Sequence, residues 1–412
     1  MVLGMQGLGL FLVVMLMWIV VPGCGGGGGD NPPQTGGGNV SQIEIKDLGP
    51  PFNLAAGART GQISLDVPAG TSLLMLIADG GNTTADIDIE ELINPTGDVL
   101  VDRRSTSVDP VGKNEFHALD DTLASGTLWA RRGQSLLAGT YKFRVASYNE
   151  SASAVQVHAI INHRENPTDG KLDVNLIFCG IPGLNKDNAL ADPQFQVLLN
   201  EFKRIYAQAN IQVNVAGTFS CNDEARLTFL STSNGEFGDL LAQSSMTGNQ
   251  AMNFFFVQNI NGESGPLGLA AKIEGPALLR GTRYSGVVVT TLNGGLSQLS
   301  QADLKMQGTT MAHEGGHFLG LYHTTERCGA RAIECPGFDI NGNGQIDSWE
   351  VVDPLPDTLE CPSLLYGPEV SPDECLGRDG TNLMFWQASI DIVQDRLTAD
   401  QNNVLQRNPY VH

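Results

Sequence analysis

The chain has 412 residues, and 24 Lys and Arg against 45 Asp and Glu give it a formal net charge of −21. This length is greater than that of an ordinary domain with a single hydrophobic core, and it predicts two domains plus processing segments. A hydrophobic content of 41% is enough to fold and excludes global disorder. The acidic balance argues against a nucleic-acid partner, which requires basic patches to neutralise phosphates. It is typical of a protein kept soluble outside the cell, with attraction of basic substrates as the alternative.

The first residues are typical of an export signal. Leu8 to Val21 is an almost uninterrupted apolar run, too short to span a bilayer comfortably, and residues 1–23 are predicted to be a signal peptide. The run ends in Val-Pro-Gly before Cys24, which resembles the lipobox of bacterial lipoproteins. This resemblance implies acylation of Cys24, with residues 24–39 as a Gly-rich flexible tether.

The expected location of such a protein is the cell surface or the outer membrane, reached through a lipid anchor, or the surroundings after release. One feature departs from the usual signal, because no Lys or Arg precedes the apolar run. Plain secretion and an uncleaved anchor therefore remain alternatives.

The other cysteines are typical of an exported protein with disulfides. Their even number predicts three bridges, and none has the Cys-x-x-Cys spacing of a metal site. We expect Cys179 to pair with Cys221, because each ends a strand and a single crossover helix makes the two strands parallel neighbours. The remaining four are then expected to pair among themselves. The six candidates are Cys179, Cys221, Cys328, Cys335, Cys361 and Cys375.

Residues 40–168 have the pattern of an all-β domain. Short segments of alternating or apolar residues are separated by Gly, Pro and Asn turns, which favours a β-sandwich. The phrase Leu-Ala-Gly-Thr-Tyr at 137–141, followed by a strand, resembles the pre-peptidase C-terminal type of sandwich that accompanies secreted bacterial peptidases. The predicted strands lie at Gly61–Val67, Leu73–Ala78, Asp86–Ile89, Thr140–Val145 and Ala154–Ile160.

Residues 169–412 change to an α/β pattern after the turn cluster Asn166–Gly170. Asp192 and Pro193 predict a helix start, and a stripe of apolar residues follows from Phe195 to Ala209. Strands on both sides and a later helix near Leu304 predict a largely parallel sheet. The strands are expected at Lys171–Cys179, Ile211–Val215, Met252–Val257 and Ser285–Leu292.

The strongest signal in the chain is HEGGHFLGLYH at 313–323, which has the form H-E-x-x-H-x-x-G-x-x-H. His313 and His317 are four residues apart, so one helical face presents both imidazoles to a single Zn²⁺. Gly320 is expected to take the left-handed conformation that ends the helix, which returns His323 as the third ligand. A three-ligand site with an open fourth position is the catalytic kind, and Glu314 is the predicted general base.

This eleven-residue pattern resembles that of the metzincins, which are zinc peptidases with an α/β fold. Those enzymes carry a methionine in a tight turn beneath the metal, and Met384 in Asn-Leu-Met at 382–384 fits that turn. The position two after it is Trp386, which cannot supply the tyrosine hydroxyl that some metzincins place near the metal. The resemblance implies that Met384 is a structural residue of the site.

Within the metzincins, the chain is most similar to the pappalysin family. The similar phrases are Leu-Gly-Leu-Tyr-His-Thr at 319–324, with Cys328 shortly after, and Leu-Thr-Ala-Asp-Gln at 397–401. The resemblance covers roughly Lys171 to Pro409. A cysteine that pappalysins usually have just after the methionine turn is not present here.

These motifs predict a secreted, lipid-anchored zinc endopeptidase that hydrolyses internal peptide bonds of extracellular proteins. The resemblance implies that the substrate lies along an edge strand, for which Leu267–Ile273 is the candidate, although an ordinary sheet strand is the simpler interpretation. Two other functions remain open. One is a catalytically silent surface or adhesion protein that retains the peptidase shell, and the other is a non-peptidase zinc hydrolase.

A second metal site is predicted in an insertion at about 328–380. Residues 339–350 match the twelve-residue EF-hand loop, with Gly344 at the sharp turn. Cys335-Pro336-Gly337 leaves no room for a normal entering helix, so we expect a lone structural Ca²⁺ loop. An Asn/Gly-rich surface turn without a metal is the alternative. The predicted ligands are Asp339, Asn341, Asn343, Gln345 through its carbonyl, Asp347 and Glu350.

Removal of calcium with zinc held saturating is expected to lower the thermal stability and to expose the insertion to proteolysis, because the ordered loop braces both sides of the zinc cleft. Melting curves and limited proteolysis with and without a calcium-selective chelator measure this. The dissociation constant of the loop for Ca²⁺ is expected in roughly the 10⁻⁴ to 10⁻³ M range. A calcium titration that is unchanged in the Asp339→Ala, Glu350→Ala double variant would show that the site does not exist.

Overall fold

A computed structural model describes residues 42–412 of the chain, apart from 82–83, 103–115, 120–121, 223, 233–234, 263–264, 292–294, 326–352, 354, 360 and 362–369. The predicted signal peptide, tether and calcium loop, together with Cys24, Cys328 and Cys335, lie outside the described residues.

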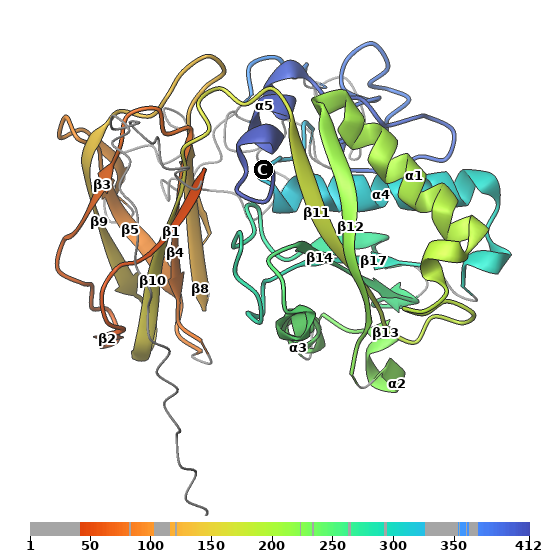
Figure 1. The fold of residues 1–412 in the computed structure, drawn as a ribbon, viewed down its shortest axis with the longest axis horizontal. Helices are drawn as coiled ribbons and strands as arrows, with labels where there is room; N and C mark the ends of the chain where they lie inside the picture. Colours follow the sequence, from red (N-terminus) through yellow and green to blue (C-terminus); the bar gives the residue numbers. More distant parts are fainter. Residues whose placement is uncertain are drawn as a thin grey trace, which may run out of the picture. The chain divides into compact units, whose positions relative to one another are not determined.

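The N-terminal region is rich in β-structure and contains two antiparallel sheets (Figure 1). One has the order β1-β10-β4-β8-β7, with β2 also paired to β10, and the other has the order β3-β9-β5-β6. The strands are β1 (Ile43–Asp47), β2 (Phe52–Leu54), β3 (Ile63–Val67), β4 (Leu73–Asp79), β5 (Ile87–Ile93), β6 (Val99–Asp102), β7 (Phe116–Leu119), β8 (Leu123–Trp129), β9 (Gly139–Ser147) and β10 (Ala152–Asn162).

Both faces of strand β4 carry buried apolar side chains. Leu74 and Leu76 belong to a core cluster shared with β3, β5 and β9 of the other sheet. Met75 and Ile77, on the opposite face of the strand, belong to the core of the following α/β region. Since successive side chains of a strand point to opposite faces, the sheet containing β4 is buried between two cores.

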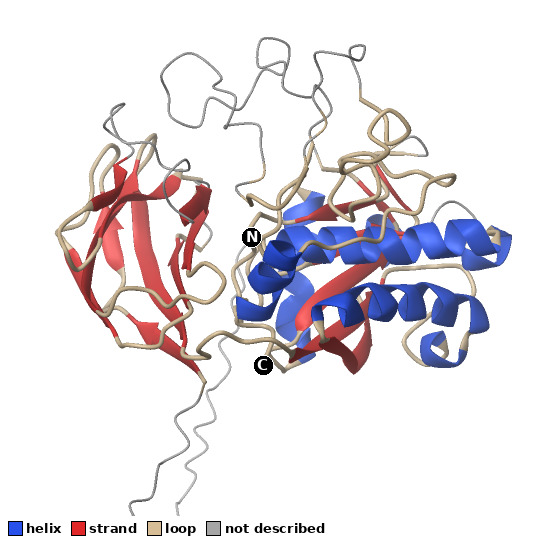
Figure 2. Cartoon of the chain, turned by 90° about the horizontal axis from the view of Figure 1, so that it is seen from above, coloured by secondary structure: helices blue, strands red, loops and turns tan. Residues whose placement is uncertain are grey.

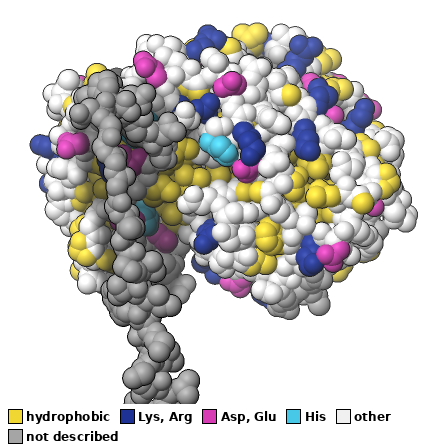
Figure 3. All heavy atoms as spheres, in the orientation of Figure 1, with side chains coloured by type: hydrophobic (Ala, Val, Ile, Leu, Met, Phe, Trp, Pro, Cys, Tyr) yellow, Lys and Arg dark blue, Asp and Glu magenta, His cyan; other side chains and the backbone are white. Residues whose placement is uncertain are grey.

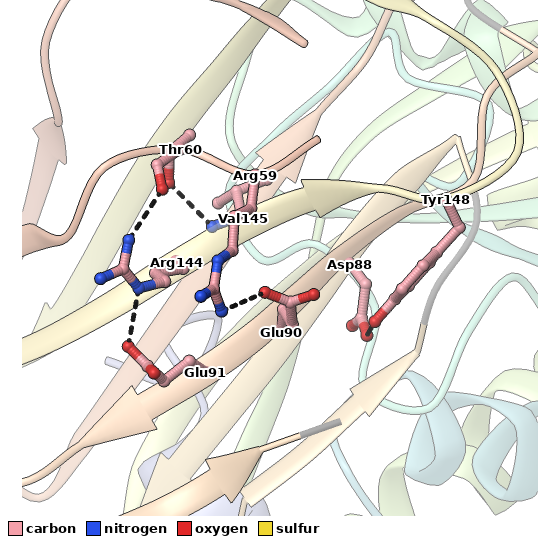
Figure 4. A network of polar contacts seen from close by, with 8 residues as sticks. All are labelled: Arg59, Thr60, Asp88, Glu90, Glu91, Arg144, Val145 and Tyr148. Atoms are coloured by element: carbon pink, nitrogen blue, oxygen red, sulfur yellow. Dashed lines mark hydrogen bonds and ion pairs between the residues drawn. The ribbon is translucent and has the colours of Figure 1, made fainter. Parts of the chain in front are cut away.

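Charged residues of β5 are satisfied by arginines on neighbouring segments (Figure 4). Arg59 donates to the fully buried Glu90 at 3.2 Å, and Arg144 donates to Glu91 at 3.0 Å. Arg144 also donates to the backbone oxygen of Thr60 at 3.0 Å. Because a buried charge is costly unless it is paired, these arginines allow β5 to carry acidic residues inside the region.

The rest of the chain forms an α/β region around the sheet β12-β11-β14-β17-β16. All neighbouring strands are parallel except β16, which is antiparallel to β17. The elements are β11 (Gly170–Phe178), α1 (Pro193–Tyr206), β12 (Ile211–Ser220), α2 (Glu224–Leu227), β13 (Phe229–Leu230), α3 (Glu236–Ala242), β14 (Met252–Val257), β15 (Asn259–Ile260), β16 (Gly268–Ala270), β17 (Val287–Thr290), α4 (Gln301–Phe318) and α5 (Ala399–Arg407), with short 3₁₀ turns η1 (Ala189–Ala191), η2 (Ala207–Ala209), η3 (Gln243–Thr247) and η4 (Leu296–Gln298).

Helices cover both faces of this sheet. Phe254 and Phe256 of β14 pack in the core that contains α1 and α4, whereas Phe255 packs with Leu240 and Leu241 of α3. Helices α1 and α4 lie beside each other, as Figures 1 and 2 show. The alternation of side chains along one strand thus fixes α4 on a defined face of the sheet.

Several local predictions are confirmed and some are wrong. The largely parallel sheet and the bounds of β14 are as predicted, and Asp192 caps α1 by accepting from the backbone N–H of Gln194. Helix α4 begins three residues earlier than Leu304, because Ser300 and Asp303 form a reciprocal capping box. Strand β17 is shorter than the predicted Ser285–Leu292.

The disulfide predicted from the strand order is present. Cys179 and Cys221 follow β11 and β12, whose last residues Phe178 and Ser220 are paired in register, and their Cα atoms are 5.2 Å apart. A second bridge joins Cys361 to Cys375. Both agree with the predicted division of the cysteines.

Ser41–His412 forms one compact unit. Part of the reason is the buried Arg407 of α5, which donates to the backbone oxygens of Ala130 and Gln134 and to the side-chain oxygens of Asn166 and Asn403. The predicted boundary between residues 168 and 169 lies between β10 and β11 and stays a prediction.

On the face seen in Figure 3, basic and acidic side chains are scattered among one another. Within the described residues, no helix is both long and apolar enough to cross a membrane.

Replacing Cys179 and Cys221 together by Ser is expected to lower the free energy of unfolding by about 4 kcal/mol, because the bridge closes a longer loop in the unfolded chain than a typical short one. The sequence separation is 42 residues, against 14 for Cys361 and Cys375, whose removal is expected to cost about 3 kcal/mol. Urea unfolding of both double variants measures the difference. The same stability in all three proteins would contradict this expectation.

Candidate active site

Helix α4 carries the first two histidines of the motif and is fixed against α1. The hydroxyl of Tyr206 donates to the backbone oxygen of Ala312 at 3.2 Å. A Cβ placed on Gly308 would lie 2.5 Å from the backbone oxygen of Leu198, so only glycine permits this approach of the helices. The helix therefore presents His313 and His317 from a fixed backbone.

The chain turns back directly after α4. Gly320 has a φ of +109°, as predicted for the residue that ends the helix, and its N–H donates to the backbone oxygen of His317 at 2.9 Å. The N–H of Thr324 then donates to the backbone oxygen of Met384 at 3.0 Å. This turn and pairing place His323 beside the two helical histidines.

The three imidazoles converge through their Nε2 atoms. The Nε2 of His323 lies 3.3 Å from that of His313 and 3.0 Å from that of His317. The Nδ1–H of His313 donates to the oxygen of Leu383, and that of His317 donates to the oxygen of Leu321, both at 2.7 Å. A carbonyl only accepts, so each of these two rings keeps a free lone pair on Nε2.

This arrangement fits zinc. A tetrahedral ion about 2.0–2.1 Å from each nitrogen requires nitrogens about 3.3 Å apart, close to the distances observed. The ligands must also be neutral. Burial, followed by the neighbouring His323, lowers the pKa of His313 to about 3, and the same causes lower the pKa of His317 well below its ordinary value.

Two glycines inside the motif allow close packing on both sides of α4. A Cβ on Gly315 would lie 2.8 Å from the hydroxyl oxygen of Tyr206, and one on Gly316 would lie 2.8 Å from the sulfur of Met384. Met384 is fully buried, and its N–H is held by the side-chain oxygen of Asn382 at 2.8 Å. The predicted methionine turn thus lies directly against the zinc-motif helix.

Glu314 is held under the edge strand β16. Its Oε2 accepts from the backbone N–H of Ala270 at 2.8 Å, and burial raises the pKa of its carboxyl to about 7. A Cβ on Gly268 would lie 2.5 Å from the Cγ of Glu314 and 3.0 Å from the Cγ2 of Thr310. Gly268 therefore lets the edge strand approach the glutamate closely.

A cleft of about 1020 Å³ opens beside these groups. His313 and Glu314 lie on its wall, with the edge strand at one side. Residues 385–390 and 392–395, which follow the methionine turn, also line the cleft. Arg204 of α1 connects to this segment by donating to both Glu201 and Asp395. His313 is the histidine of the motif that reaches the lining of the cleft.

The structure brings together His313, Glu314, His317, His323, Gly320 and Met384, as the sequence predicted. Strand β16, Gly268–Ala270, is shorter than the predicted edge strand Leu267–Ile273 and lies within it. Trp386 lies in the cleft wall, and its indole N–H donates to the oxygen of Val370 at 2.8 Å.

Cys361, Cys375 and Asp379 also lie close together, but the two sulfurs are bonded to each other.

The sequence prediction missed the role of the edge strand in holding the glutamate. Gly268 was the available signal, because a glycine inside a strand often marks a close approach of another group. Nothing in the sequence indicated Ala270, which contributes only its backbone N–H.

The end of helix α4 carries two histidines, and a glycine turn brings a third histidine beside them. Together with the partly buried Glu314, they define a site of the zinc metallopeptidase class. Residues 193–324, which run from the start of α1 to just past His323, match the family model described as Metallo-peptidase family M12B Reprolysin-like. This part of the chain is therefore similar to a reprolysin-like metallopeptidase domain.

Among solved structures, the chain is similar to metalloproteinase-II from Bacteroides fragilis, with 13% identity and a TM-score of 0.31 over 58% of this chain and 54% of that one. It thus spans about half of the length of that protein. It is also similar to a chain in the structure of a chaperone-substrate complex, with 14% identity and a TM-score of 0.27 over 60% of this chain and 35% of the other. A comparison with curated proteins finds no match.

Gly268→Ala is expected to lower kcat by about 10- to 100-fold, because the new methyl group displaces Glu314 or the edge strand by a large fraction of an ångström. Zinc content is expected to stay unchanged, since the atoms nearest to a Cβ at Gly268 belong to Glu314 and Thr310 and not to the three imidazoles. Gly61→Ala is the matched control, because a Cβ there meets nothing within 4 Å. Equal rates for Gly268→Ala and the wild type would contradict the role of this glycine.

Proposed function

We propose that this protein is a zinc-dependent endopeptidase that hydrolyses internal peptide bonds of extracellular proteins. The observation that carries the proposal is the convergence of the Nε2 atoms of His313, His317 and His323 beside Glu314, at the wall of an open cleft. A structural zinc site would be closed by a fourth protein ligand. Among the described residues, the histidine cluster has three.

The chain's own residues would divide the chemistry as follows. When bound by the three histidines, zinc supplies a Lewis acid that activates water and polarises the scissile carbonyl. Glu314 takes a proton from the attacking water and returns it to the leaving amine. The N–H of Ala270 donates to the Glu314 carboxylate and so fixes its orientation for this proton transfer. The rings of His313 and His317 stay unprotonated and do not take part in proton transfer, because the pKa of each is lowered far below its ordinary value.

The substrate would bind as an extra strand. Strand β16 is at the edge of the sheet, and its first residue Gly268 and the preceding Leu267 line the cleft. An extended peptide paired with this edge gains main-chain hydrogen bonds, and its side chains alternate between the cleft and solvent.

The proposal extends to the subfamily and to the rest of the precursor. Within the metzincins we assign the chain to the pappalysin type, on the motif residues 319–324 and on Leu397–Gln401, which lead into α5. Residues 40–168 would be a β-sandwich of the pre-peptidase C-terminal type, and residues 169–412 the catalytic domain. The precursor would be exported and anchored through a lipid on Cys24. The loop at 339–350 would hold structural Ca²⁺.

Glu314→Gln is expected to reduce hydrolysis of casein by about 100-fold or more, the usual scale for the loss of a general base. Zinc content is expected to remain near one ion per chain, because the three imidazoles are intact. A fluorescent casein assay together with metal analysis measures both. Full activity in this variant would reject Glu314 as the base, and a zinc-loaded wild type that cleaves no protein would favour the silent surface protein.

His323→Ala is expected to lose zinc as well as activity, because only two ligands remain. His158→Ala is the matched control, since His158 lies on β10 and binds Asp47 at 2.7 Å, away from the motif. Zinc retention in His323→Ala equal to that in His158→Ala would contradict the ligand assignment.

A further inference from the structure

A buried glutamate that takes no part in the proposed reaction lies beside the glycine turn of the zinc motif. Glu274 is 4% exposed, follows the edge strand β16, and is not part of the cleft wall. Its Oε1 accepts from the Nδ2 of Asn408 at 2.7 Å. Asn408 directly follows α5 and is fully buried. Burying these two polar side chains costs free energy unless they form hydrogen bonds, so the contacts of this Glu274–Asn408 pair matter for the fold.

The pair contacts the end of α4 at two points. The Nδ2 of Asn408 also donates to the backbone oxygen of Leu319 at 3.3 Å. A Cβ placed on Gly320 would lie 3.1 Å from both the Cδ and the Oε2 of Glu274, so the carboxyl group covers the turn directly. The last carbonyls of a helix lack intrahelical partners, and here a side chain from another part of the chain satisfies one of them.

The next residue of the same segment satisfies another. The N–H of Gly275 donates to the backbone oxygen of Phe318 at 3.0 Å. A Cβ on Gly275 would lie 2.1 Å from the ring of Phe318, which shows how closely the segment is applied to the helix end.

This turn sets the positions of two zinc ligands. The oxygen of Leu321 accepts from the Nδ1–H of His317 at 2.7 Å and so orients that ring. His323 follows the turn by three residues, and its Nε2 lies 3.0 Å from that of His317. A shift of Gly320 therefore moves one ligand and the hydrogen-bond acceptor of the other.

The N-terminal region holds the pair from the opposite side. The hydroxyl of Ser125 on β8 donates to the backbone oxygen of Glu274 at 2.9 Å, in a buried contact. The segment that carries Glu274 is therefore fixed between the β-rich region and the zinc turn.

We propose that Glu274 and Asn408 are positioning residues that hold the glycine turn of the zinc motif in the geometry required for metal binding, and that the N-terminal β-rich region secures Glu274 for this role. The inference rests on the proposed zinc site. It gives the N-terminal region a direct part in the metal affinity of the peptidase.

The test is the dissociation constant of zinc, measured by competition with a chromogenic chelator on residues 24–412 or the full chain, together with kcat and KM on a peptide substrate. Glu274→Ala removes the closer of the two acceptors of the Asn408 amide, and zinc affinity is expected to fall by about 10- to 100-fold. KM at saturating zinc is expected to change by less than about twofold, because Glu274 does not line the cleft.

Glu274→Gln is expected to restore zinc affinity to within about threefold of the wild type, because glutamine keeps an oxygen acceptor for Asn408. Burial raises the pKa of Glu274 to about 8, so the neutral amide resembles the form present at pH 7. Asn408→Ala is expected to weaken zinc binding as Glu274→Ala does, and the double variant to be no weaker than either single one, because the two residues act as one unit.

Glu90→Ala is the matched control, because Glu90 in β5 is also a buried glutamate (Figure 4). Its partner is Arg59, and both residues are far from the zinc motif in the sequence. It is expected to lower the melting temperature without changing zinc affinity. If Glu274→Ala lowers the melting temperature as Glu90→Ala does and binds zinc like the wild type, the pair is only a packing contact and the proposal is wrong.

If Glu274→Ala does not fold, Glu274→Asp is measured in its place, because it withdraws the carboxyl from Asn408 by one methylene group. Zinc affinity equal to that of the wild type would again overturn the proposal. A wild type that binds zinc but cleaves no peptide would reject the proposed function alone, while the zinc constants of the variants still decide the role of the pair. A wild type that binds no zinc would reject both.

Discussion

The orientation of two imidazole rings by backbone carbonyls is the constraint on which the site depends. Leu383 and Leu321 provide these carbonyls, and each accepts from the Nδ1–H of one helical histidine at 2.7 Å. A carbonyl fixes both the tautomer and the ring plane, so the Nε2 atoms of the two rings are directed toward one point. The cost is that two separate segments, the glycine turn and the methionine turn, must be held to within a few tenths of an ångström relative to α4.

Glycines make this close packing possible and weaken the helix that carries it. Positions 308, 315 and 316 of α4 are all glycine, and each would place a Cβ within 3 Å of a neighbouring atom. A glycine in a helix interior costs roughly 0.5–1 kcal/mol relative to alanine, so α4 gives up on the order of 2–3 kcal/mol of intrinsic helix stability. Its capping box and its packing against α1 and the sheet must compensate.

The sequence predicted the parts of the structure that depend on local signals. The Asp192 cap, strand β14 and the eleven-residue motif each have a pattern that is complete within a few residues. Strand β8 (Leu123–Trp129) was missed because it is buried throughout and therefore lacks the alternation of a half-exposed strand. Glu274 and Asn408 were missed for a different reason. They are 134 residues apart in sequence, and only the tertiary fold brings them together.

The N-terminal β-rich region shares a hydrophobic core with the α/β region. Six of its buried apolar side chains belong to the hydrophobic core of the α/β region, namely Leu73, Met75, Ile77, Leu123, Trp129 and Ile160. Exposing side chains of this size costs roughly 1.5–3 kcal/mol each, so separating the two regions would cost on the order of 10 kcal/mol, as much as a typical domain's whole stability. An accessory module on a linker would not share a core of this extent. The β-rich region is therefore part of the folded unit that supports the histidine site, even though the family match spans only residues 193–324.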